Sequence, residues 1–255
     1  MMKLIFLLIP ISLTFFSCSD SSSTKVTEAD NITEKKTTSV TEIPRTDSIL
    51  KVHTSSSYIY PIDQTSDDAS LKRFVSRLRQ CVERKNLPEF ISCLDTGIVV
   101  SYGGGMHGIP TFLDEWKLNK QAEKSALWSK MNLFLDLGGA WKDHQKTEFC
   151  FPYPQSDILF EHIDQDLDWY RTAVCISPQT IVYEKAATNS KKTALLSYEV
   201  LEIMERGDHF IQIRTLDKQV SGFVKTEQLI LSADAYPILQ KVDGAWKIVS
   251  FAPFD

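Results

Sequence analysis

The sequence predicts an α+β domain followed by a small all-β barrel and a C-terminal β-hairpin, over residues 66–172, 173–231 and 232–255. Apolar residues recur at helical spacing through most of residues 69–137. Short segments of alternating polarity, separated by turns, fill residues 173–231. Asp243-Gly244 then joins two apolar segments as a two-residue turn. The final hairpin is expected to pack either on the barrel or on the front domain.

The first 17 residues are typical of an export signal. An apolar stretch runs from Leu4 to Phe16, about 13 residues against the roughly 20 that span a bilayer. Cys18 follows directly after it, and this arrangement resembles the signal of bacterial lipoproteins. The resemblance implies that Cys18 is lipidated and anchors the chain in the bacterial cell envelope, at the outer membrane. Ordinary cleavage after Ser19 is the alternative.

Residues 18–65 are predicted to form a disordered tether. They are rich in Ser, Thr, Asp, Glu and Lys and contain few aromatic residues before Tyr58. Such a composition buries too little apolar surface to offset the entropy lost on ordering. A flexible coil of about 45 residues spans roughly 35–40 Å, which would hold the folded part away from a membrane surface.

A helical hairpin is predicted to open the front domain. Asp67-Asp68 supplies N-cap carboxylates to a first helix, and Asn86-Leu87-Pro88 ends that helix and starts a second one. The apolar face of the first helix comprises Leu71, Phe74, Val75, Leu78, Cys81 and Val82. Cys81 and Cys93 both fall on apolar faces, so a Cys81–Cys93 disulfide and a pair of buried thiols are equally consistent with the sequence.

A G-x-G-x-x-G motif follows the next apolar strand, at Gly103, Gly105 and Gly108. A dinucleotide site also requires free amides at a helix N-terminus and a second parallel strand that ends in an acidic residue. Pro110 removes one of these amides, and no such strand follows Trp116. We therefore expect the glycines to provide positive φ angles in a tight turn, and we expect the protein to use no cofactor.

An acidic cluster near residue 165 contains the candidate metal ligands. These residues are Glu161, His162, Asp164, Asp166 and Asp168. Their D-x-D-x-D spacing matches the start of a calcium loop, but Trp169 and Cys175 stand where that loop needs Gly and Glu. No second His or Cys lies at zinc-finger spacing from His162. An acidic surface turn is the prediction, with metal binding as the alternative.

The segment from Thr193 to Leu229 resembles a bacterial SH3-type (SH3b) domain. Leu195 and Leu196, the strand from Phe210 to Ile213, Gly222-Phe223-Val224 and Leu229 stand at the positions of that family's apolar strands. The usual middle-strand Trp is Phe210 here. The resemblance covers residues from about 173 to 231, and it implies a module that binds cell-wall peptides or partner proteins. The whole chain is similar to uncharacterised SH3-domain-containing bacterial lipoproteins, and its front domain resembles the nuclear-transport-factor-like fold.

Two phenylalanines of this segment are predicted to form a ligand-binding surface. Strand alternation places Phe210 and Phe223 on the face opposite the buried aliphatic residues. If their strands are neighbours in register, the two rings form an aromatic pair outside the core, with Tyr183 or Tyr198 at its rim. The alternative is that the final hairpin or the front domain covers the pair.

The sequence favours a binding protein over an enzyme. Its net charge of −5 argues against a nucleic-acid partner. Cell-wall cysteine hydrolases carry their nucleophile after an Asp at a helix N-terminus, but no Cys here follows Asp, and no G-x-S-x-G occurs. We therefore expect a membrane-anchored lipoprotein that recognises peptidoglycan or an envelope protein. The alternative is a cell-wall-modifying or metal-dependent hydrolase with an atypical site.

Overall fold

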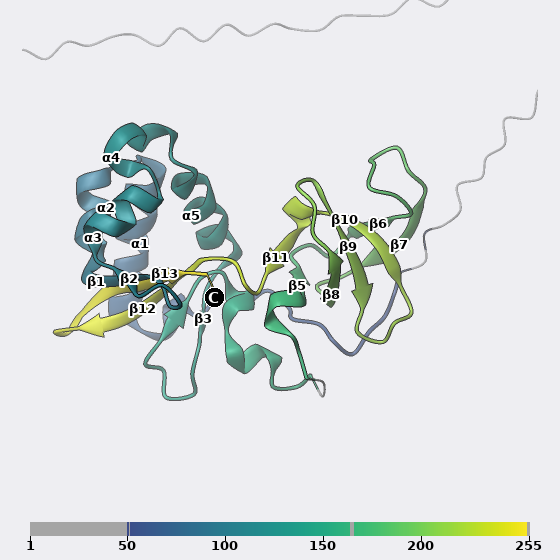
Figure 1. Ribbon diagram of the computed structural model, residues 1–255. Helices are drawn as coiled ribbons and strands as arrows, with labels where there is room; N and C mark the ends of the chain where they lie inside the picture. The colour runs from purple at the N-terminus through teal and green to yellow at the C-terminus, as the bar shows by residue number, and fades with distance from the viewer. Residues whose placement is uncertain (1–49, 51, 164–165, 254–255) are drawn as a thin grey trace, which may run out of the picture. The chain divides into compact units, whose positions relative to one another are not determined.

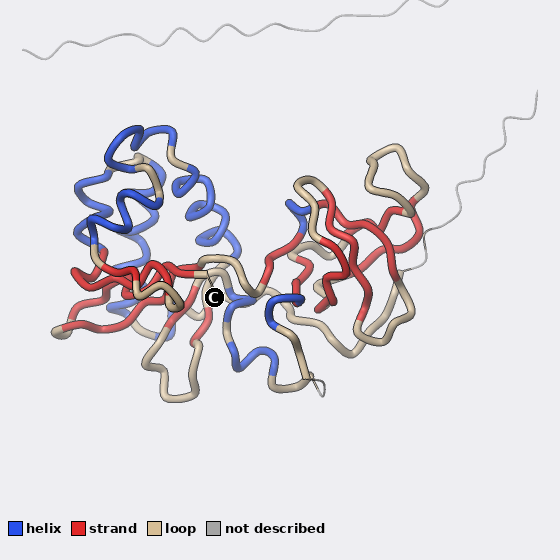
Figure 2. Tube along the Cα trace, viewed as in Figure 1, coloured by secondary structure: helices blue, strands red, loops and turns tan. Residues whose placement is uncertain are grey.

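The computed structural model describes residues 50, 52–163 and 166–253 and contains two β-sheets (Figures 1 and 2). The six-stranded sheet, here the front sheet, has the order β2-β1-β13-β12-β4-β3. The second sheet has seven strands in the order β11-β5-β8-β9-β10-β6-β7. This α+β architecture with a large β part agrees with the predicted class. The signal peptide, Cys18, Asp164 and the tether up to residue 49 lie outside the described residues.

Five α-helices accompany the sheets. They are α1 (Ala69–Glu83), α2 (Leu87–Cys93), α3 (Ile109–Glu115), α4 (Leu118–Gln121) and α5 (Ala126–Leu137). The front sheet comprises β1 (Leu94–Ser101), β2 (Met106–His107), β3 (Ala140–Trp141), β4 (Phe149–Cys150), β12 (Tyr236–Val242) and β13 (Ala245–Ala252). The second sheet comprises β5 (Thr172–Cys175), β6 (Thr180–Tyr183), β7 (Lys192–Leu196), β8 (Val200–Glu205), β9 (Phe210–Thr215), β10 (Ser221–Lys225) and β11 (Leu229–Leu231). Within the described chain, no helix is both long and apolar enough to cross a bilayer.

The predicted helical hairpin is confirmed. One carboxylate oxygen of Asp68 accepts hydrogen bonds from the backbone N–H groups of Ser70 and Leu71, at 2.6 and 2.9 Å, which caps α1. Asn86 caps α2 in the same way through the N–H of Glu89. All six residues of the predicted apolar face of α1 are buried.

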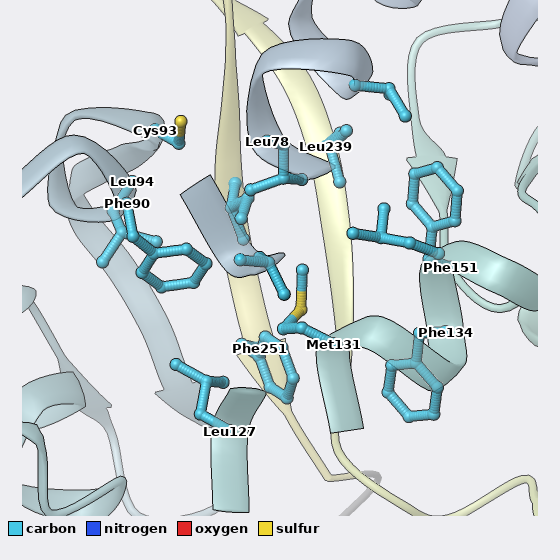
Figure 3. Packing of buried hydrophobic residues seen from close by; sticks show 14 of the residues in the cluster. Leu78, Phe90, Cys93, Leu94, Leu127, Met131, Phe134, Phe151, Leu239 and Phe251 are labelled. Atoms are coloured by element: carbon cyan, nitrogen blue, oxygen red, sulfur yellow. The ribbon is translucent and has the colours of Figure 1, made fainter. Parts of the chain in front are cut away.

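The helices cover one face of the front sheet and enclose a single hydrophobic core (Figures 1 and 3). Phe251 of β13 lies at its centre, with ring centroids 6.0 Å from Phe112 and 5.0 Å from Trp116. Phe90 of α2 packs edge-on against Trp128 of α5 at 5.5 Å. Burial of these large rings, together with the aliphatic side chains of the same cluster, stabilises this region.

The glycine-rich motif forms the turn of a β-hairpin. β1 and β2 are antiparallel, and Gly105 and Gly108 have φ angles of +61° and +89°, which confirms the predicted positive-φ turn. The neighbour of β1 on its other side is the last strand of the chain, β13. Gly103 and Gly105 therefore lie between β1 and β2, whereas Gly108 follows β2 and is the N-cap of α3.

The C-terminal hairpin belongs to the front sheet. β12 and β13 pair through the Asp243-Gly244 turn, as predicted. β13 then lies parallel to β1, and β12 lies antiparallel to β4. The front domain is thus built from two segments distant in sequence, which decides between the two packing partners left open for this hairpin.

The second sheet differs from the predicted barrel in one respect. Every strand pair in it is antiparallel, but among the described residues no ladder joins β7 to β11, so the sheet is not a closed barrel. At its β7 end the sheet meets the chain before α1: Val52 forms a parallel bridge with Leu195. This segment thus shields part of an edge whose backbone groups would otherwise be open to further pairing.

The prediction that the tether extends to residue 65 is wrong for residues 52–65. Ile59 is only 3% exposed, in a small cluster with Val174 and Val200 of the second sheet. The carbonyl of Ser57 accepts the N–H of Val200 at 2.9 Å, and Ile59 donates to the carbonyl of Tyr198 at 2.8 Å. The average composition of residues 18–65 did not reveal that residues 52–65 are structured. Their structure depends on pairing with strands that are distant in the sequence.

Candidate functional site

A groove lined by aromatic residues lies where the segment before α1 meets the segment before Asp164. Its volume is about 570 Å³. The lining residues are Tyr58, Ile59, Tyr60, Pro61, Ile62, Ile158, Leu159, Glu161 and His162. We call it the tyrosine groove. Tyr60 is 59% exposed and Tyr58 37% exposed, an unusual amount of accessible aromatic surface for two neighbouring side chains.

The rings of this groove form one continuous cluster. The ring centroids of Tyr58 and Tyr60 are 4.5 Å apart, and those of Tyr60 and Tyr198 are 5.8 Å apart at an angle of 70°. Tyr58 also lies 5.9 Å from the His162 ring. Such spacings lie in the favourable range for aromatic pairs, so each ring helps to fix its neighbour.

Local backbone geometry explains why two tyrosines reach solvent here. In an extended segment, successive side chains point to opposite sides. Ile59 points into the core, so Tyr58 and Tyr60 on either side of it point outward. Tyr198 has a left-handed backbone conformation, with φ +53°, and its carbonyl accepts the N–H of Ile59. The hydrogen bond between Ile59 and Tyr198 therefore positions Tyr58 and Tyr60 relative to Tyr198.

The predicted metal ligands are distributed rather than gathered. Glu161 is ion-paired with His144 at 2.8 Å, and His162 lies against Tyr58. Asp168 caps a short 3₁₀ helix (Trp169–Arg171) by accepting the N–H of Tyr170 at 3.0 Å. In the part of the chain that the structure describes, no group of three His, Cys, Asp or Glu side chains is arranged to hold a metal ion.

Phe210 and Phe223 lie on one face of the second sheet but not opposite each other, and their role as a ligand-binding surface stays a prediction. Phe210 and Phe223 are both half-buried, as strand alternation predicts. In the β9–β10 register, however, Phe223 lies opposite Gln212, and Phe210 packs edge-on against Tyr183 at 5.6 Å. Tyr183 is 5% exposed, so it packs beneath Phe210 and does not form an exposed rim. The fourth predicted residue, Tyr198, instead packs against Tyr60, a lining residue of the tyrosine groove.

Sequence reasoning missed Tyr58 and Tyr60 because it assigned them to the tether. The signal was present as Tyr-Ile-Tyr-Pro at residues 58–61, which alternates like a short strand and ends in a proline. Only the pairing of this segment with the residues around Val200 turns the pattern into a surface.

A few residues before Tyr58, a histidine lies between two carboxylates. Nδ1 of His53 is 2.8 Å from Oε1 of Glu199, and Nε2 is 3.0 Å from Oδ2 of Asp217. Glu199 is 2% exposed. The hydroxyl of Thr215 donates to the other Asp217 oxygen at 2.6 Å. We call His53, Glu199 and Asp217 the His53 cluster; His53 and Asp217 also line a cavity of about 470 Å³.

The two cysteines of the predicted helical hairpin are neighbouring buried thiols. The Cys81 thiol donates to the carbonyl of Leu78 at 3.1 Å, and the Arg77 guanidinium lies 3.7 Å from the Cys93 sulfur. The neighbouring Cys81 thiol and the Arg77 guanidinium lower the pKa of Cys93 to about 7, although burial opposes this shift. Both cysteines are free in this structure, and their oxidation to a disulfide stays a prediction.

No protein-family model matches the chain, and neither a curated protein nor a solved structure shows significant similarity to it.

Proposed function

We propose that this protein is a lipoprotein of the bacterial cell envelope, anchored through Cys18, that has an SH3-type second region and binds cell-wall peptide in the tyrosine groove beside that region, without catalysing a reaction. The tyrosine groove carries this proposal. It combines exposed rings, a hydrophobic floor and a charged edge at Glu161. Such a combination is characteristic of recognition sites rather than of ordinary protein surface.

Tyrosine suits this task for a physical reason. Its ring gives a large contact area while losing only two side-chain torsions on binding, and its hydroxyl can pair with backbone amides of a ligand. The clustering of Tyr58, Tyr60 and Tyr198 orders the rings before a ligand arrives. Less conformational entropy is then lost in the complex, which favours binding.

The surroundings of the groove support binding over hydrolysis. Its ionisable pair, Glu161 with His144, is exposed, with both side chains more than half accessible to water. General acid–base catalysis depends on groups held in a site from which water is largely excluded. An exposed ion pair beside a cluster of aromatic rings is better suited to orienting a polar ligand than to transferring a proton.

The test is co-sedimentation of the full-length protein, in detergent, with purified cell-wall sacculi. Tyr60→Ala should abolish sedimentation while leaving the melting temperature nearly unchanged, because the ring is mostly exposed. Tyr102→Ala is the matched control: Tyr102 is 55% exposed but lies beside the front sheet, with its hydroxyl donating to Ser250. It should sediment like wild type.

Phe223→Ala distinguishes the two candidate binding surfaces, which are the tyrosine groove and the Phe210–Phe223 face. Loss of sedimentation in this variant, with Tyr60→Ala unaffected, would move the binding site to the Phe210–Phe223 face. If the wild-type protein itself stays in the supernatant, cell-wall peptide is the wrong ligand.

A further inference from the structure

While Glu199 and Asp217 are both ionised, only one protonation state of His53 satisfies the geometry of the His53 cluster. Both ring nitrogens of His53 face carboxylate oxygens, at 2.8 Å and 3.0 Å. A carboxylate can only accept, so each nitrogen must carry a proton for both hydrogen bonds to form. Neutral imidazole has a single N–H, which would leave a nitrogen lone pair against a carboxylate oxygen. The arrangement therefore requires the imidazolium form.

This cluster contacts the segment that carries Tyr58 and Tyr60. His53 lies five residues before Tyr58 in the sequence, and its own N–H donates to the carbonyl of Leu195 at 2.9 Å. Glu199 immediately follows Tyr198, whose ring contacts Tyr60. The His53–Glu199 contact thus ties together the two stretches of chain that carry the three tyrosines.

We propose that His53, Glu199 and Asp217 form a proton-dependent latch that holds residues 52–60 on the second sheet, so that the tyrosine groove is assembled while His53 is doubly protonated and loosens when it loses a proton. The effect on a ligand rests on the proposed function. The latch itself is a property of the fold and does not depend on the ligand.

The charges around His53 agree in sign with this proposal. Burial lowers the pKa of His53, but the hydrogen bonds and charges of Glu199 and Asp217 outweigh it and raise that pKa above its ordinary value of 6.5. Burial raises the pKa of Glu199 despite its bond to His53. The pKa of Asp217 is lowered: burial opposes the shift, while bonds from Thr215, from the N–H of Gln219 and from His53 outweigh it.

The direction of the pH response follows from the raised pKa of His53. A group that binds its proton more tightly in the folded state stabilises that state fully below its unfolded pKa. This contribution is lost as the pH rises through the raised pKa of His53. The latch is therefore expected to open on the alkaline side, and to change the segment's closing equilibrium about tenfold for each unit of pKa shift.

Hydrogen exchange of the full-length protein tests the latch without any ligand. The amides of His53 and Ile59, which donate to Leu195 and Tyr198, are followed between about pH 6 and about pH 9, across ordinary histidine titration. After correction for the intrinsic exchange rate, their protection should fall as the pH rises, while core amides of β13 stay constant. Unchanged protection over this range would overturn the proposal.

Two variants and a control complete the test. His53→Gln should have low protection at every pH, and Asp217→Asn should move the midpoint of the transition to lower pH because one facing charge is gone. His107→Gln is the control, since His107 is exposed in β2 and its ring Nδ1 lies 2.8 Å from a nearby carbonyl, that of Gly105. It should behave as wild type. An unshifted midpoint in Asp217→Asn would contradict the latch.

Failure of the latch and failure of the proposed function give different results. If protection falls with pH but sacculi never bind, the latch stands and the ligand is wrong. If sacculi bind equally at both ends of the pH range and protection is constant, the binding function stands and the latch is wrong.

Discussion

Two aromatic clusters of the molecule differ in their exposure to solvent. In the front region, Phe90, Phe112, Trp128 and Phe251 are all at most 1% exposed and pack in ring contact within one core. In the second region, Tyr58 and Tyr60 also form ring contacts, but both remain accessible to solvent. Ring contact alone therefore does not show whether a ring belongs to a core; its exposed fraction does.

A second contrast concerns buried charge. In the front region the core cluster consists of hydrophobic side chains. In the second region Glu199 is buried and depends on a histidine from a segment 146 residues away in sequence. Buried carboxylates are costly unless paired, so this pairing makes the second region sensitive to pH at a point where the front region is not.

Replacing a core ring should produce the largest effect and sharpen the first contrast. Phe251→Ala removes the side chain that contacts both Phe112 and Trp116 beneath the helices. We expect a loss of about 3–5 kcal/mol in the free energy of unfolding, since the cavity cannot refill completely. Denaturant unfolding measures it. A loss no larger than that of Tyr60→Ala would show that the exposed fraction does not separate the two regions.

A glycine of the second sheet tests whether that region is loosely packed throughout. Gly222 of β10 lies so close to the paired strand β6 that a Cβ atom would be 2.6 Å from the carbonyl oxygen of Tyr183 and 2.6 Å from a methyl of Val182. Because a backbone atom cannot yield cheaply, Gly222→Ala should cost about 2–3 kcal/mol.

The matched control for this glycine is Gly105→Ala in the β1–β2 turn. No heavy atom lies within 4 Å of a Cβ there, so its cost should be limited to the left-handed backbone, about 1 kcal/mol. Thermal unfolding measures the loss of stability in both variants. Equal losses would mean that the contact between β10 and β6 at Gly222 is not tight.

Sequence patterns predicted the elements whose stabilising contacts are local. The apolar face of α1, its Asp68 cap and the Asp243-Gly244 turn are all as expected, since each depends on residues a few positions apart. Alternation in β9 and β10 also identified the buried positions Ile211 and Val224.

The features that sequence patterns missed depend on distant partners. The front sheet needs β13 to lie beside β1, and the groove needs residues 52–60 to pair with the residues around Val200. His53 carries no local pattern at all, because its partners Glu199 and Asp217 come from the other end of the chain. Propensity and periodicity describe neighbours in sequence, so they cannot place such contacts.

The smallest effect separates the two regions by the direction of their pH dependence. A hydrogen bond from Lys241, with those from Ser70 and the N–H of Leu71, holds the pKa of Asp68 well below its ordinary value of 3.8. A lowered pKa stabilises the folded state above the unfolded pKa and is lost as the pH falls through the folded value. The front region should therefore weaken in acid, whereas the His53 cluster weakens in alkali.

Asp68→Ala is expected to cost about 1 kcal/mol at neutral pH, because the cap of α1 is lost. Asp68→Asn should cost less, since an amide oxygen still accepts from Ser70 and Leu71 while only the 2.8 Å ion pair with Lys241 disappears. Unfolding measured at neutral pH and again well below pH 3.8 should show the difference between wild type and Asp68→Asn shrinking in acid. A difference that instead persists in acid would mean that the Asp68 charge does not stabilise the front region, and the two regions would no longer differ in the sign of their response.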